Sequence, residues 1–156
     1  MTDKAPALPL LLTLAGILPF ISLAALSIYV TGDGNLIGEQ SFPVLFLLFY
    51  AATILSFLGG IRWGAALLAK PFDSWSLGLS VLPSLAAWAI LIGVMLTSAF
   101  SLALFAFAAL FAIQLVWDRL AWQAGKLPVW FRVCRYSATT GAILSLLAAG
   151  IAIQLA

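Results

Sequence analysis

Residues 42–69 read FPVLFLLFYAATILSFLGGIRWGAALLA, and this apolar run decides the class of the protein. The run exceeds the roughly 20 apolar residues that an α-helix needs to cross a bilayer. Arg62 is the only charged residue in it, and it lies between Gly60 and Gly64. Because an ionisable side chain at membrane depth is costly, Arg62 is the first candidate for a functional residue.

The composition excludes a soluble domain with a polar surface. Hydrophobic residues make up 65% of the chain and charged residues 8%. The formal net charge of +2 is too small to indicate a nucleic-acid partner. The chain has no histidine and one cysteine, Cys134, so it can form no internal disulfide and lacks the usual ligands of haem, copper and catalytic zinc. We expect an all-α membrane bundle without metal or cofactor, folded as one domain over residues 1–156.

Charges and turn residues divide the apolar sequence into five expected transmembrane helices. Their predicted ranges are 8–30, 42–68, 75–96, 99–117 and 137–154. Turn-forming residues at 31–35 separate the first two ranges, and Pro71 followed by Asp73 separates the second from the third, with Asp73 or Ser74 as the cap. The third and fourth ranges are separated only by a Thr-Ser pair at 97–98, so a re-entrant pair is the alternative there.

Basic residues set the expected orientation of the bundle. If the five helices alternate in direction, one side of the membrane receives Lys4, Lys70, Arg119, Lys126, Arg132 and Arg135. The other side receives Asp33 and Glu39, so the amino terminus is predicted to be cytoplasmic and the carboxyl terminus outside. Residues 22–24 also fit the cleavage site of a secretory signal, but the apolar run continues to Val30, which favours an uncleaved helix.

The sequence between the fourth and fifth helices, residues 118–136, mixes basic and aromatic residues, which is typical of a segment at the membrane interface. Gly125 is expected to close one helix and Pro128 to open the next. The candidate lipid-facing basic residues are Lys126, Arg132 and Arg135, and the expected belt of interfacial tryptophans is Trp75, Trp117, Trp122 and Trp130. The alternative is that the basic residues only anchor the start of the fifth helix.

Small residues recur at every fourth position of the second helix and form a thin stripe. The stripe consists of Ala52, Ser56, Gly60 and Gly64. Arg62 lies about 200 degrees around the helix from Gly60 and shares its own face with Gly59 and several alanines. Because both faces are thin, we expect this helix at the centre of the bundle, and homodimerisation through the stripe is the alternative use.

Asp118 is the expected partner of Arg62, because alternation of the helices brings both residues toward the cytoplasmic side. Gln114, one helical turn from Asp118, would accept hydrogen bonds from the remaining N–H groups of the guanidinium. Asp73 is the alternative carboxylate partner of Arg62. The arrangement is either a structural ion pair between the second and fourth helices or part of a substrate site.

Pro83 is expected to kink the third helix near the depth of Arg62, because it removes one helical hydrogen bond. Polar groups from three helices would then converge around a small cavity for a head group, an ion or an amphipathic molecule. The candidate polar cluster consists of Arg62, Asp118, Gln114, Ser80 and Ser84. The alternative for the two serines is that they only satisfy freed backbone groups.

No catalytic pattern is recognisable in the sequence. A Ser/His/Asp set is impossible without histidine, and the chain has no glycine-rich phosphate loop and no carboxylate pair within one helix. Asp33, Asn35 and Glu39 provide too few ligands at the wrong spacing for a calcium loop. We therefore predict a non-enzymatic bundle that binds membrane lipid, another membrane protein or a second copy of itself, and no nucleic acid. A small oligomeric transporter or channel that uses Arg62 is the alternative.

Four strings of residues resemble a known family. They are SFLGGIRWG at 56–64, VLPSLAAW at 81–88, DR at 118–119 and LPVW at 127–130. In these strings the chain resembles the membrane-protein family called domain of unknown function 3429, to which animal transmembrane protein 69 is similar. The resemblance implies a bacterial inner-membrane protein with relatives in mitochondria, and it implies no established activity.

Overall fold

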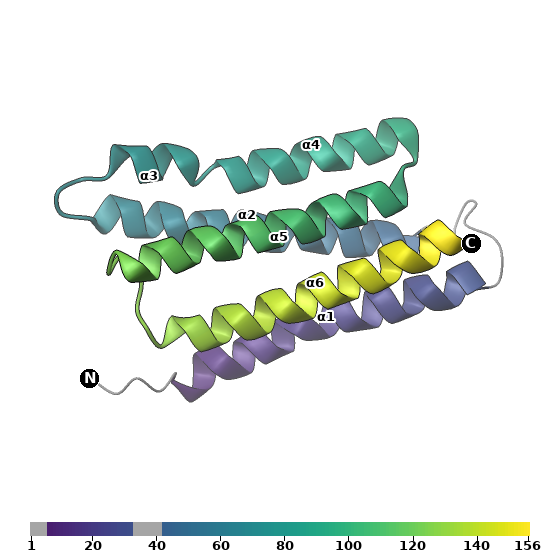
Figure 1. Ribbon diagram of the computed structural model, residues 1–156, viewed down its shortest axis with the longest axis horizontal. Coiled ribbons are helices and arrows are strands. Elements are labelled where there is room, and N and C mark those ends of the chain that lie inside the picture. Colours follow the sequence, from purple (N-terminus) through teal and green to yellow (C-terminus); the bar gives the residue numbers. More distant parts are fainter. Residues whose placement is uncertain (1–5, 33–41) are drawn as a thin grey trace.

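The computed structural model describes residues 6–32 and 42–156, and the elements in these ranges are helices (Figure 1). They are α1 (Ala7–Gly32), α2 (Phe42–Leu68), α3 (Ser74–Leu79), α4 (Leu82–Thr97), α5 (Phe100–Gln123) and α6 (Phe131–Leu155). Five stretches are long and apolar enough to cross a membrane, with α3 and α4 together forming the third. By helix length and hydropathy this is a multi-pass membrane protein, which confirms the predicted all-α fold with five candidate spans.

Large apolar side chains cover the outside of the bundle. Leu11, Phe57 and Ile113 are 66%, 63% and 64% exposed, respectively. Water would penalise so much apolar surface, whereas acyl chains contact it readily. The outer surface is therefore suited to lipid.

Helix α2 lies at the centre of the bundle. It contacts every other helix and has the largest buried share of the five candidate spans. Helices α1 and α6 lie side by side, α6 also runs along α5, and α4 follows α2 (Figure 1). The central position is the predicted one, but of the two faces with small residues only that of Gly59 packs closely against another segment.

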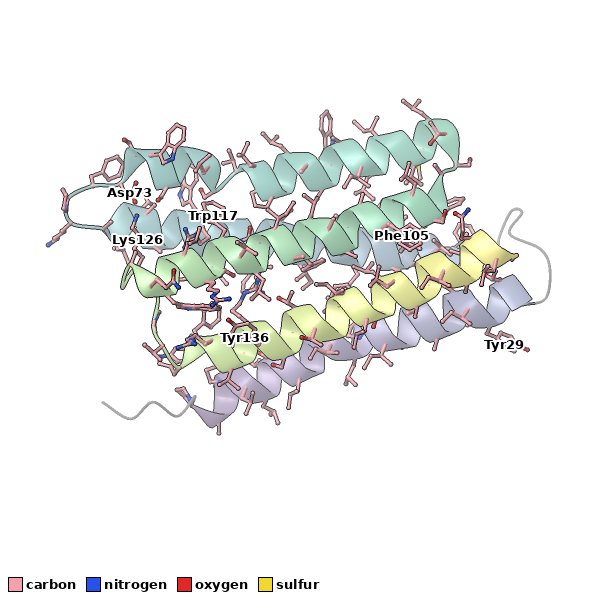
Figure 2. The ribbon with its side chains drawn as sticks, viewed as in Figure 1. Tyr29, Asp73, Phe105, Trp117, Lys126 and Tyr136 are labelled. Carbon is pink, nitrogen blue, oxygen red and sulfur yellow. The ribbon has the colours of Figure 1, made fainter. Side chains whose placement is uncertain are left out.

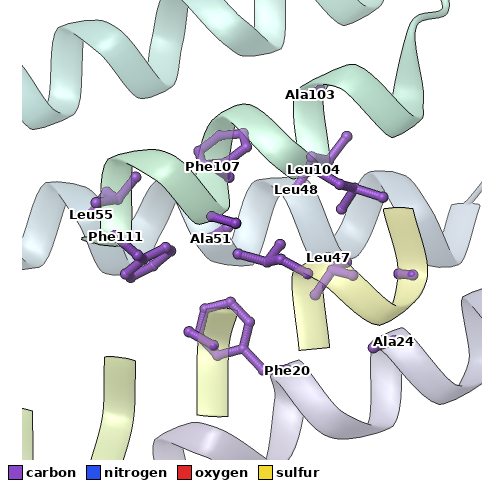
Figure 3. Packing of buried hydrophobic residues seen from close by; sticks show 14 of the residues in the cluster. Phe20, Ala24, Leu47, Leu48, Ala51, Leu55, Ala103, Leu104, Phe107 and Phe111 are labelled. Carbon is purple, nitrogen blue, oxygen red and sulfur yellow. The ribbon is translucent and has the colours of Figure 1, made fainter. Parts of the chain in front are cut away.

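The core is built from leucines and aromatic rings (Figure 3). Leu47 of α2 is completely buried, as are Leu104 and Phe107 of α5. Phe20 of α1 meets Phe111 of α5 edge to face, with 5.7 Å between the ring centroids. Such pairs have a preferred geometry, so they help to fix how α1 and α5 are rotated toward each other.

The third candidate span is interrupted. Ser80 and Val81 form a turn between α3 and α4, and Pro83 lies in the first turn of α4. A proline at that position sacrifices no helical hydrogen bond, because the first N–H groups of a helix have no partner within it. The third span is therefore broken where the sequence predicts a kink, but the expected cause is wrong, because Pro83 begins a helix and removes no hydrogen bond from within one.

Two connections fall where the sequence predicts them. Ser98 ends α4 with a φ of 55°, and Gly125 follows α5 with a φ of 68°. The backbone N–H of Lys126 then donates to the carbonyl of Ala121 at 2.9 Å. Glycine adopts a positive φ without the steric cost of a side chain, which explains its place at the end of α5.

The fourth and fifth helices extend beyond their predicted ranges of 99–117 and 137–154. Helix α5 continues to Gln123 and α6 begins at Phe131, so only residues 124–130 lie outside a helix there. The charges of Asp118 and Arg135 do not end the helices, because both side chains are buried between them.

Candidate functional site

Charged side chains gather at one end of the bundle, here termed the basic end. It contains the connection from α2 to α3 and the connection from α5 to α6 (Figure 1). The charged residues that the structure describes are Arg62, Lys70, Asp73, Asp118, Arg119, Lys126, Arg132 and Arg135. Lys4, Asp33, Asn35 and Glu39, to which the sequence assigns charge or turn roles, fall outside the described ranges. The charged side chains of the described residues therefore lie at this end of the bundle.

Asp118 of α5 is paired with Arg135 of α6. Nε of Arg135 donates to Oδ2 of Asp118 at 2.8 Å, and both side chains are 4% exposed. The predicted ion pair between Asp118 and Arg62 is wrong, because within the described part of the chain the salt bridge of Asp118 is with Arg135. Helix α6 packs along α5 and brings its own guanidinium to the carboxylate. The prediction that Arg135 faces lipid is wrong for the same reason.

Gln114 adds a second contact to the same carboxylate. Its Nε2 donates to Oδ1 of Asp118 at 3.4 Å, one helical turn away on α5. A buried ion pair stabilises a fold only when the remaining polar atoms also have partners. Nη2 of Arg135 has no hydrogen-bond partner among the described residues. The pair therefore joins α5 to α6, but one nitrogen atom of its guanidinium is buried without a hydrogen bond.

Arg62 of α2 lies against Trp117 of α5. Its Cζ atom is 4.4 Å from the centroid of the indole ring, which is a cation–π contact. Arg62 is 5% exposed, and it lies six residues before the end of α2, about 9 Å into the helix. The indole attracts the cation but supplies no counter-charge.

Arg62 also lines a cavity of about 790 Å³ at the basic end, here termed the basic cavity. Its wall consists of Arg62, Ala65, Ala66, Leu68, Ala69, Lys70, Pro71, Phe72, Asp73, Ser76, Ala124, Gly125 and Lys126. These residues come from the end of α2, the connection that follows it, α3 and the end of α5. Three of them are cations and one, Asp73, is a carboxylate. A concave surface with this excess of positive charge attracts anions.

Asp73 holds two parts of this wall together (Figure 2). Its Oδ1 accepts from the backbone N–H of Ser76 at 2.9 Å, which confirms the predicted cap of the third span. Its Oδ2 accepts from Nζ of Lys126 at 2.5 Å, so the α2–α3 connection is tied to the end of α5. The bond from Lys126, followed by those from Ser76, holds the pKa of Asp73 well below its ordinary value.

Asp73→Asn should lower stability at neutral pH but not in acid. Asparagine keeps the helix cap and removes the ion pair with Lys126. Since the folded-state pKa of Asp73 is depressed, its contribution is present above the unfolded-state pKa and is lost as pH falls through the folded-state value. Thermal unfolding in detergent should show a constant difference between the two proteins above about pH 5 that shrinks below about pH 4. A difference that grows on acidification would contradict the pairing.

The two serines of the predicted polar cluster lie against α2, one turn from Arg62. Oγ of Ser80 donates to the backbone carbonyl of Leu77 at 2.6 Å. This hydroxyl therefore bonds to a backbone group at the end of α3, as in the alternative in which the serines only satisfy the backbone. A Cβ placed on Gly59 would lie 2.5 Å from the carbonyl oxygen of Ser80 and 3.7 Å from Oγ of Ser84. Helix α2 and the break in the third span therefore touch backbone to backbone.

The small-residue stripe of α2 is not the surface used for this close approach. Its members, Ala52, Ser56, Gly60 and Gly64, are exposed or half-buried. A Cβ on Gly60 or Gly64 would meet no atom of the described chain within 4 Å. Pairing of two copies through the stripe stays a prediction.

A comparison with protein families places this geometry in a known group. The family model described as "Protein of unknown function (DUF3429)" matches residues 5–151. The chain belongs to the DUF3429 family. The match includes Arg62, Trp117, Asp118 and Arg135, so the whole described basic end of this DUF3429 protein lies inside the family region.

Transmembrane protein 69 of Xenopus tropicalis is a relative of this DUF3429 chain, with 37% identity over 150 residues. The alignment covers 91% of this chain and 53% of the relative, so the chain spans about half the length of that curated relative. No solved structure matches the chain. Neither the family description nor the name of the relative states an activity.

Two residues of the site in this DUF3429 protein escape sequence reasoning. Trp117 is expected only as part of an interfacial belt, and Arg135 only as a lipid-facing cation. A signal for Arg135 exists in α6, because Arg135, Thr139, Ala142 and Leu146 follow the three-and-four spacing of one helix face, and all four are buried. An arginine on the face that carries small and apolar residues points to the bundle interior.

Proposed function

We propose that this DUF3429 protein is a non-enzymatic membrane protein that binds the phosphate head group of an anionic lipid in its basic cavity. Its main support is the position of Arg62, which is 5% exposed and lines the cavity. Among the described residues Arg62 has no salt bridge to a carboxylate.

The described carboxylates near the cavity are already engaged. Asp118 pairs with Arg135, and Asp73 pairs with Lys126. Arg62 and Lys70 therefore have no contacting counter-charge in the described part of the chain. A cation at membrane depth is costly without an anion beside it, so an oxyanion in the basic cavity would stabilise the protein.

Phosphate suits this arrangement because a guanidinium can donate two parallel N–H bonds to two of its oxygens. Contact with Trp117 restricts the guanidinium of Arg62 before a ligand arrives, which reduces the entropy lost on binding. Lys70 and the half-exposed Lys126 add positive charge at the rim. Binding of this kind needs no proton transfer, so we propose no reaction.

We further propose that the protein spans a bacterial inner membrane and that its basic end lies on the cytoplasmic side. Loops rich in lysine and arginine are retained on the cytoplasmic side, where anionic lipids attract them. Helix α1 begins at the basic end and α6 finishes at the other (Figure 1), so the amino terminus would be cytoplasmic and the carboxyl terminus outside.

Transport of an anion is the second candidate function, favoured by the break between α3 and α4. Interrupted helices often form substrate sites in transporters. Here the carbonyl of Ser80 lies at Gly59, three residues before Arg62. Anion flux through reconstituted vesicles that disappears in Arg62→Gln would favour transport over static binding.

Arg62→Gln should reduce the retention of anionic lipid about tenfold, because a lost charge-assisted hydrogen bond corresponds to roughly 1.5 kcal/mol or more. Native mass spectrometry of protein released from nanodiscs that contain phosphatidylglycerol and phosphatidylcholine measures the retained lipid.

Arg119→Gln is the matched control, since Arg119 is exposed at the basic end and does not line the basic cavity. Equal losses in the two variants would contradict a site at Arg62. Inorganic phosphate should not displace the retained lipid, and ready displacement would overturn the assignment to a lipid.

A further inference from the structure

We infer that one acyl chain of the bound lipid lies in an apolar groove between α2, α4 and α5. This inference rests on the proposed head-group site and names the lipid tail as its second point of contact. The groove has a volume of about 270 Å³. Its lining includes Leu55 of α2, Pro83 and Ala86 of α4, and Leu110, Gln114 and Trp117 of α5.

The groove and the basic cavity meet at one pair of side chains. Arg62 lines the basic cavity, Trp117 lines the groove, and 4.4 Å separates the guanidinium from the indole centroid. Figure 2 shows Trp117 between α5 and the interrupted third span. Leu55 precedes Arg62 by seven residues, which places both on one face of α2 about 10 Å apart. One face of α2 therefore leads from the cationic site into the apolar groove.

The groove opens sideways toward the bilayer. Leu82 and Ile113 at its rim are 52% and 64% exposed. Apart from Gln114 and the indole of Trp117, its lining side chains are aliphatic. An unfilled apolar groove loses dispersion contacts, so hydrocarbon from the bilayer is its natural occupant.

The ligand must therefore be an amphipathic anion, with a phosphate on the Arg62 side of the pair and hydrocarbon on the Trp117 side. A groove of about 270 Å³ lies near the lower limit of ordinary ligand sites. It holds one chain, and the second chain of a two-chain lipid remains in the bilayer.

The test uses phosphatidic acid with a photoreactive diazirine in the middle of one acyl chain, incorporated into nanodiscs with the full-length protein. After irradiation, mass spectrometry of the peptides locates the crosslinks. We expect labelling to concentrate on residues 79–86 and 110–117. Labelling spread evenly over the lipid-facing sides of α1, α4 and α6 would overturn the inference.

Ala86→Phe fills the groove and should lower labelling of residues 110–117 about tenfold, the change expected when about two methylene groups lose their buried position. Ala89→Phe adds the same group on the exposed side of α4 and should leave the labelling unchanged. Equal labelling in both variants, with lipid retention still dependent on Arg62, would refute the groove alone. Retention that does not depend on Arg62 would refute the head-group site itself.

Discussion

Asp118→Asn should lower the free energy of unfolding by about 3–5 kcal/mol, the largest effect that we expect in this protein. The substitution keeps the size of the side chain but removes the carboxylate that Nε of Arg135 contacts at 2.8 Å. Arg135 is 3% exposed, and its Nη2 already has no partner in the described structure. The variant would leave an uncompensated guanidinium buried between α5 and α6.

Unfolding by sodium dodecyl sulfate in mixed micelles, followed by tryptophan fluorescence, measures this loss. Asp118→Asn combined with Arg135→Gln should recover most of it, because both charges of the pair are then gone. Asp118→Asn combined with Arg62→Gln should not, since Arg62 contacts Trp117 and the basic cavity. Recovery in the Arg62 combination alone would show that Arg62 is the partner of Asp118 after all.

Gly59→Ala should destabilise the protein by about 1–3 kcal/mol, the range found when a packed interior is overfilled. A Cβ at Gly59 would lie 2.5 Å from the carbonyl oxygen of Ser80, far inside van der Waals contact. That oxygen belongs to the backbone, so it cannot rotate away as a flexible side chain would. Helix α2 and the α3–α4 break would have to separate.

Gly60→Ala provides the matched control on the same helix. No described atom lies within 4 Å of a Cβ at Gly60, so alanine should be tolerated and should add about 0.5–1 kcal/mol through its better helix propensity. The same unfolding measurement compares the two variants. A Gly59→Ala protein as stable as Gly60→Ala would show that α2 and the third span are less closely packed than the structure has them.

The five spans are predictable because long apolar runs have few stable alternatives to a helix in a bilayer. The predicted range 42–68 is that of α2, and the predicted boundary at 97–98 is the end of α4. The larger errors lie at the end of α5, which is Gln123 and not Trp117, and at the start of α6, which is Phe131 and not Ser137. Asp118 resembles the start of a polar connection in the sequence, and only its burial against α6 reveals it as an interior residue.

The contents of the site are harder to predict than the helices. Sequence reasoning places Arg62 near the end of α2 that carries the other basic residues, because its position follows from counting residues along the helix. Its neighbour depends on how α5 and α6 are rotated, and a rotation of one residue exchanges Trp117 for Asp118. The close contact of α2 is made by Gly59 because the backbone of Ser80 lies beside it. The four-residue repeat of small residues in α2 does not reveal the position of Ser80.

The most direct test of head-group binding is the distance between the guanidinium nitrogen atoms of Arg62 and a lipid phosphorus atom. Solid-state NMR dephasing between nitrogen and phosphorus, on arginine-labelled protein in phosphatidylglycerol bilayers, measures it. The contribution of Arg62 is the part of the signal that Arg62→Gln removes. We predict that this part is dephased by phosphorus, as hydrogen bonding to phosphate requires. An Arg62 signal without dephasing would contradict lipid binding in the basic cavity.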